Sequence, residues 1–82
     1  MAERLVATVG AGLAGQAVMG DDAHLERAVR LVLRLPARDW PAVHEVAAAW
    51  LARFFEPVEP GCALRATARI VAAYERIRKE AS

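Results

Sequence analysis

The sequence has 82 residues, a mass of 8.9 kDa and a formal net charge of +1. This length predicts one domain, residues 1–82, whose folded monomer exposes roughly 4,800 Å² and has little depth for a substrate cleft. The small net charge excludes a strong overall electrostatic attraction to nucleic acid or to a membrane surface. A disordered chain is excluded by a hydrophobic content of 56%.

The first half of the chain predicts two helices. One runs from about Glu3 to Met19, and Gly20 follows it as a C-terminal glycine. The next runs from Asp22 to Leu35 and is capped by one of two adjacent aspartates. It ends before Pro36, because proline lacks the N–H that would continue the helix.

The second half predicts two more helices. The third runs from Trp40 or Pro41 to Phe55, and the fourth from Pro60 or Gly61 to about Lys79. A turn containing two prolines separates them, and Pro60 is suited to open the fourth helix. Short connections favour antiparallel neighbours, so we predict an all-α fold, a compact four-helix single domain.

The first helix contains a glycine pattern, GAGLAG, from Gly10 to Gly15. After the apolar segment of residues 5–9, it resembles the dinucleotide-binding fingerprint at the N-terminus of flavin- and NAD-dependent enzymes. That resemblance implies a strand and a pyrophosphate site. However, Gly20 would end the following helix early, and no second strand ends in an acidic residue near position 35. We therefore predict a helix whose small residues let another helix approach closely, and no cofactor.

The third helix is apolar on most sides. Its main stripe, expected in the core, is Val43, Val46, Ala47, Trp50 and Phe54. Further apolar residues lie outside that stripe, which indicates burial on two sides. One small core faces only one side, so we predict that Trp40, Leu51 and Phe55 contact another protein.

Two stripes of basic residues follow helical spacing. The stripe on the second helix and its exit is Arg27, Arg30, Arg34 and Arg38, and the stripe on the fourth is Arg65, Arg69, Arg76 and Lys79. If the two faces adjoin, they form a patch able to contact phosphates. The alternative is a solvated face with pairs inside each helix: Glu26–Arg30, Glu75–Arg78 and Glu75–Lys79.

No residue pattern indicates catalysis or a metal site. His24 and His44 lack ligand spacing within their helices. The one cysteine, Cys62, has no base beside it in the sequence and forms no intrachain disulfide, which favours the cytoplasm. The uncharged segment of residues 5–20 is shorter than the ~20 residues of a membrane span.

The sequence therefore favours a small intracellular protein–protein interaction module that is not an enzyme. An inhibitor, an adaptor or a small subunit would fit, and the partner is another protein or a second copy. The alternative is a nucleic-acid-binding accessory protein that uses the two arginine stripes.

Overall fold

The computed structural model describes residues 2–81, and within them it contains helices and no strand. The predicted all-α, four-helix fold is therefore confirmed. The elements are α1 (Ala2–Met19), α2 (Asp22–Arg34), a 3₁₀ turn η1 (Ala37–Asp39), α3 (Trp40–Trp50), a π-helical turn η2 (Leu51–Phe55) and α4 (Cys62–Ala81).

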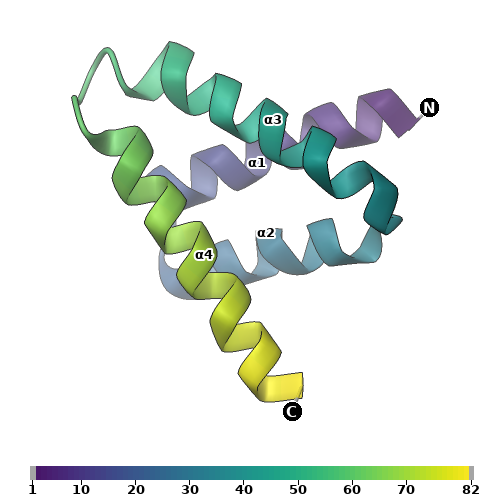
Figure 1. Cartoon of the computed structure of the whole chain (residues 1–82). Coiled ribbons are helices and arrows are strands. Elements are labelled where there is room, and N and C mark those ends of the chain that lie inside the picture. The colour runs from purple at the N-terminus through teal and green to yellow at the C-terminus, as the bar shows by residue number, and fades with distance from the viewer. Residues whose placement is uncertain (1, 82) are drawn as a thin grey trace.

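The helices form a flat body whose Cα atoms span 36 × 30 × 16 Å. α1 packs against α3 and α2, and α4 crosses α2 (Figure 1). α3 and α4 meet at the turn that joins them and diverge from there, so α4 points away from α3 at its C-terminal end (Figure 1). This divergence leaves one side of α4 without a helix beside it.

The glycine pattern lies inside α1, which is helical from Ala2 onward, so the segment of residues 5–9 is not a strand. Gly10 is the point of close approach. A Cβ at Gly10 would lie 2.6 Å from Val46 Cγ1 and 2.9 Å from the carbonyl oxygen of Val43 on α3. A Cβ at Gly12 would meet nothing within 4 Å. The predicted close helix–helix approach is thus confirmed at Gly10 and is not required at Gly12.

The core lies where all four helices face one another. Its largest fully buried side chains come from α1, α2 and α3: Leu13, Leu25, Val29, Val32 and Val43. Leu51 of η2 joins the same cluster, and α4 contributes Ala66, Ile70, Ala73 and Ile77. Each helix thus buries one apolar stripe and leaves its other faces for solvent or for a partner.

The π-helical turn decides which aromatic side chain at the end of α3 packs inward. Glu56 N–H donates to Leu51 O, five residues back, which fits one more residue into the turn than an α-helix would. Before this turn the inward positions of α3 are Val43 and Ala47, followed by Leu51, at ordinary α-helical spacing. The π turn then brings Phe55 against the core one turn later. Trp50 and Phe54, which the α-helical periodicity puts in the core stripe, are exposed instead.

α4 begins at Cys62 and not at Pro60, because Gly61 adopts a φ of +90° that reverses the chain just before the helix. The Glu56 carboxylate accepts hydrogen bonds from the N–H groups of Gly61 and Ala63, the latter at 2.9 Å. These bonds satisfy amides at the start of α4 that have no partner within the helix. Glu56 therefore caps α4 from the far side of the turn.

The same two backbone hydrogen bonds, first from Gly61 and then from Ala63, lower the pKa of the Glu56 carboxyl. A folded-state pKa below the unfolded value stabilises the fold above the unfolded pKa, and this contribution disappears as the pH falls through the folded pKa. We expect Glu56→Gln to lower the melting temperature at neutral pH. The difference from the original chain should vanish at acidic pH, as thermal melts across pH would show. A difference independent of pH would contradict the charged cap.

Candidate functional site

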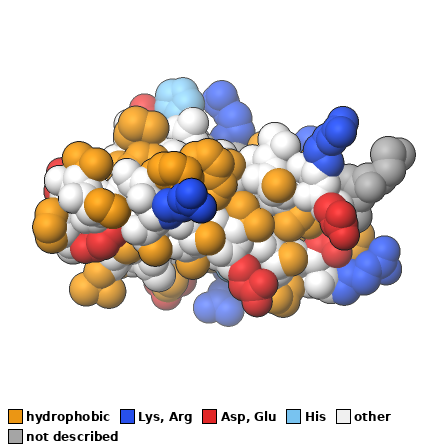
Figure 2. Space-filling model, turned by 90° about the horizontal axis from the view of Figure 1, so that it is seen from above, with side chains coloured by type: hydrophobic (Ala, Val, Ile, Leu, Met, Phe, Trp, Pro, Cys, Tyr) orange, Lys and Arg blue, Asp and Glu red, His pale blue; other side chains and the backbone are white. Residues whose placement is uncertain are grey.

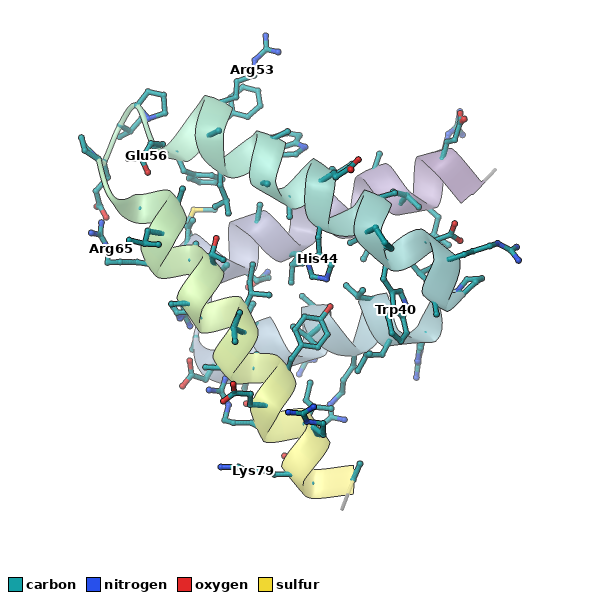
Figure 3. The ribbon with its side chains drawn as sticks, in the orientation of Figure 1. Trp40, His44, Arg53, Glu56, Arg65 and Lys79 are labelled. Atoms are coloured by element: carbon teal, nitrogen blue, oxygen red, sulfur yellow. The ribbon has the colours of Figure 1, made fainter. Side chains whose placement is uncertain are left out.

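The three residues predicted to contact a partner all pack against the core of the single chain. Leu51 is only 2% exposed. Trp40 and Phe55 are half-buried against the core cluster, and the Trp40 indole N–H donates to Leu35 O at 2.9 Å, pointing toward α2 (Figure 3). None of the three forms the exposed apolar surface that the sequence attributes to this helix.

The exposed aromatic surface at the end of α3 belongs to Trp50 and Phe54. Their ring centroids lie 4.6 Å apart, and the Arg53 guanidinium lies 5.5 Å from the centre of the Phe54 ring. Figure 2 looks down on the side where α3 runs, and apolar side chains gather there around a basic one. This helix therefore has exposed apolar surface, but Trp50 and Phe54 carry it and the three predicted residues do not.

The two predicted basic stripes lie on α2 with its exit and on α4, and carboxylates of the same chain pair with half of their members. Arg69 donates to Asp22 Oδ1 at 3.0 Å and also to Ala17 O, at the end of α1. Arg76 donates to Glu26 Oε2 at 2.7 Å. Two further pairs are Arg30–Glu80 and Arg65–Glu59, each at 2.5 Å. Paired cations have less charge available for phosphate.

Four members of the stripes make no ion pair within residues 2–81: Arg27, Arg34, Arg38 and Lys79. Arg65 and Lys79 point from α4 to the side away from α3 (Figure 3). The predicted pair Glu26–Arg30 is replaced by cross-helix pairs, since Glu26 contacts Arg76 and Arg30 contacts Glu80. Three members of the stripes, Arg30, Arg69 and Arg76, thus join α2 to α4 through ion pairs.

A groove opens where α3 and α4 diverge. Its volume is ≈360 Å³, and its walls come from α3, η2 and the middle of α4: His44, Ala47, Ala48, Leu51, Thr67, Ile70, Val71 and Tyr74. A second hollow of ≈550 Å³ continues along α4 toward its C-terminal end and is bordered by Leu33 of α2. Val71 and Tyr74 line both hollows, which therefore adjoin and form one groove along α4, with Glu75 and Arg78 at the border of the second hollow.

One polar contact lies in this groove. His44 points from α3 toward α4 (Figure 3), and its Nε2 lies 2.9 Å from the Tyr74 hydroxyl oxygen. Burial lowers the pKa of His44 and raises the pKa of Tyr74. Both side chains are therefore neutral near pH 7, and the part of the groove between α3 and α4 suits an apolar or neutral surface better than a charged ligand.

The exposed face of α4 beside the groove has its side chains at alternating three- and four-residue spacing. We call these residues the α4 seam: Leu64, Thr67, Val71, Tyr74 and Arg78. Leu64 is 78% exposed and Val71 is 50% exposed. Spacing of this kind places side chains along one straight line on a helix, which is the arrangement that packs against a second helix.

Sequence reasoning missed this seam, because helical periodicity predicts one apolar stripe on the fourth helix, in which Ile70 and Val71 both lie: Thr67, Ile70, Val71, Tyr74 and Ile77. The structure separates them: Ile70 is buried, whereas Val71 is half exposed on the neighbouring face. A check for alternating spacing of three and four residues from Leu64 onward would have found it.

A second exposed surface lies between α1 and α2. Gly12, Gln16 and His24 line the two shallow hollows there, and Leu31 borders one of them. His24 Nδ1 lies 2.7 Å from Asp21 Oδ1, and Asp21 also accepts the His24 N–H as the cap of α2. Asp21 is therefore the cap of α2, and the His24 side chain lies beside it in hydrogen-bond contact.

Within residues 2–81, no helix combines the length and hydropathy that crossing a membrane requires. The same part of the chain brings together no group of three or more His, Cys, Asp or Glu side chains suited to a metal ion. Cys62 is buried and makes no disulfide. Comparisons of the chain with protein-family models, with curated proteins and with solved structures find no match.

Proposed function

We propose that this chain is a small intracellular protein–protein interaction module and that its binding surface is the groove along α4. The observation that carries the proposal is the groove made by two adjoining hollows, in which Val71 and Tyr74 line both hollows and the His44–Tyr74 contact is neutral. Grooves of this kind, between helices, receive the apolar face of another helix. A buried, free Cys62 is consistent with a reducing compartment such as the cytoplasm.

The groove fits this function better than the basic stripes fit nucleic-acid binding. Four of the eight stripe cations already contact carboxylates of the same chain. By contrast, Leu64 and Val71 beside the groove have large exposed apolar surfaces. Contiguous exposed apolar surface on a small protein usually marks an interaction site.

Site-specific photo-crosslinking tests this proposal. A photo-reactive amino acid replaces Val71 in the groove or, as the matched control, the exposed Ala49 on the outer face of α3. We expect irradiation of cells to give a discrete protein adduct at position 71 and none at position 49. Mass spectrometry then identifies the adduct as a second copy or another protein.

Two results would remove the proposal. The first is an absence of protein adducts at position 71 in folded protein. The second is the same adducts at both positions, which indicates random collision. Nucleic acid crosslinked at Arg34 or Arg38, with no protein at position 71, would instead favour the alternative in which the stripes bind phosphates.

A further inference from the structure

The chain has more surface than a compact monomer of its mass. It exposes 5,536 Å², about 700 Å² more than the roughly 4,800 Å² expected from its mass. In a stable dimer of standard size each protomer buries about 800 Å². The excess is therefore comparable to one side of a dimer interface.

Exposed apolar side chains of α4, Leu64 and Val71, lie beside the groove. α4 diverges from α3 (Figure 1). The seam and the groove lie on the same side of α4, because Thr67, Val71 and Tyr74 of the α4 seam also line the groove. Ala47 and Ala48 form part of the α3 wall, and their small side chains leave room for a helix beside α4. The occupant with the right shape is thus a helix that lies along α4.

The α4 seam is complementary to itself when a second copy runs in the opposite direction. With a two-fold axis beside Val71, residues equally spaced before and after that position face each other across the interface. Tyr74 then lies over the small side chains near Thr67 and Ala68 of the second copy. Arg78 extends its aliphatic stem over Leu64 of the second copy.

The charged side chains of α4 also favour the antiparallel direction. In the antiparallel arrangement Glu75 faces Thr67 of the second copy, whose hydroxyl is able to donate to the carboxylate in place of its contact with Ala63 O. In a parallel pair, Glu75 would face Glu75 and Arg78 would face Arg78. Like charges placed together oppose association.

We infer that α4 pairs antiparallel with α4 of a second copy, with Val71 at the two-fold axis and the groove beside it filled by the partner helix. The inference rests on the proposed function, since it assigns the same groove to a specific partner. His44 and Tyr74 then lie at the border of a four-helix layer formed by α3 and α4 of both copies.

Cysteine crosslinking tests both the partner and its direction, in purified protein with Cys62→Ala. One chain has Thr67→Cys, the other has Glu75→Cys, and the two are mixed and oxidised. The antiparallel arrangement places these positions opposite each other, whereas Thr67 lies about 12 Å along the axis from its own copy, too far for a disulfide. We expect the mixed disulfide dimer to dominate and Ala49→Cys to give none.

Sedimentation of the unmodified chain gives an independent measurement. We expect a dimer at high micromolar concentration. Val71→Glu places two carboxylates at the axis and should raise the dissociation constant about a hundred-fold or more, with the helical circular dichroism spectrum unchanged. Val71 is half exposed in the single chain, so this variant is expected to fold.

A chain that is monomeric at every concentration overturns the inference. So does a Thr67→Cys chain that crosslinks with itself, which indicates a parallel pair, or equal crosslinking by Ala49→Cys. A monomer whose position 71 still forms an adduct with a different protein in cells removes the second copy as partner but leaves the proposed function intact.

Discussion

Leu51→Asp is expected to unfold the domain at room temperature. Leu51 is 2% exposed and lies in the core cluster between α1, α3 and α4. Truncating a buried leucine costs about 2–5 kcal/mol, and a carboxylate without a partner in the core adds further to that loss. A domain of this length has a total stability of about 4–12 kcal/mol. Circular dichroism should show the loss of helical signal.

Phe54→Asp is the matched control, because it puts the same charge three residues further along. Phe54 is 49% exposed, and its ring contacts Trp50 and Arg53 at the surface. Losing one aromatic pair costs about 0.5–1.5 kcal/mol, so this variant should remain folded. The reverse result, with Phe54→Asp unfolded and Leu51→Asp folded, would contradict the inward position of Leu51 and the outward position of Phe54. Phe55→Asp should resemble Leu51→Asp, since Phe55 packs on the core.

Gly10→Ala and Gly12→Ala are expected to change stability in opposite directions. At Gly10 the added methyl group would lie within 3 Å of Val46 and of the Val43 carbonyl oxygen, so α1 and α3 must move apart. Overpacking of this kind costs about 1–3 kcal/mol. At Gly12 the added methyl group meets nothing, and alanine in a helix is favoured over glycine by about 1 kcal/mol.

Thermal or denaturant unfolding measures both variants. In a domain of this size 1 kcal/mol shifts the melting temperature by about 4–8 °C, so the two changes should be resolved easily. Stabilisation by both substitutions would contradict the close approach of α1 and α3 at Gly10. Destabilisation by both would indicate that Gly12 has a contact absent from this fold.

The sequence is sufficient to assign the glycine segment to a helix and not to a nucleotide-binding turn. The pattern Gly10–Gly15 satisfies the glycine spacing of a fingerprint, but Gly20 and the missing second strand predict a helix, and α1 is helical throughout. The spacing of the glycines does not show which of them allows the close approach of α3. The close approach depends on where α3 crosses α1, and that crossing occurs at Val46.

The candidate site was predictable only in part. An excess of apolar residues in the third helix correctly indicated exposed apolar surface there. Which face of α3 turns inward, however, depends on how α3 packs against α1, and the face of Val43, Ala47 and Leu51 is the buried one. A fixed α-helical period also contains no signal for the π turn that places Phe55 inward and Phe54 outward. The groove itself depends on the angle at which α4 leaves α3.

The sequence by itself determined the four helices, their approximate ends and the helical identity of the glycine segment. Those features depend on neighbouring residues: Gly20 and Pro36 end helices, and Asp21 caps one. Only the tertiary structure decided which side chains stay exposed and which charged residues pair. It paired Arg76 with Glu26 across two helices, where sequence spacing indicates pairs within one helix. It also left Val71 exposed beside a buried Ile70, because burial depends on which helix crosses α4 and at what angle.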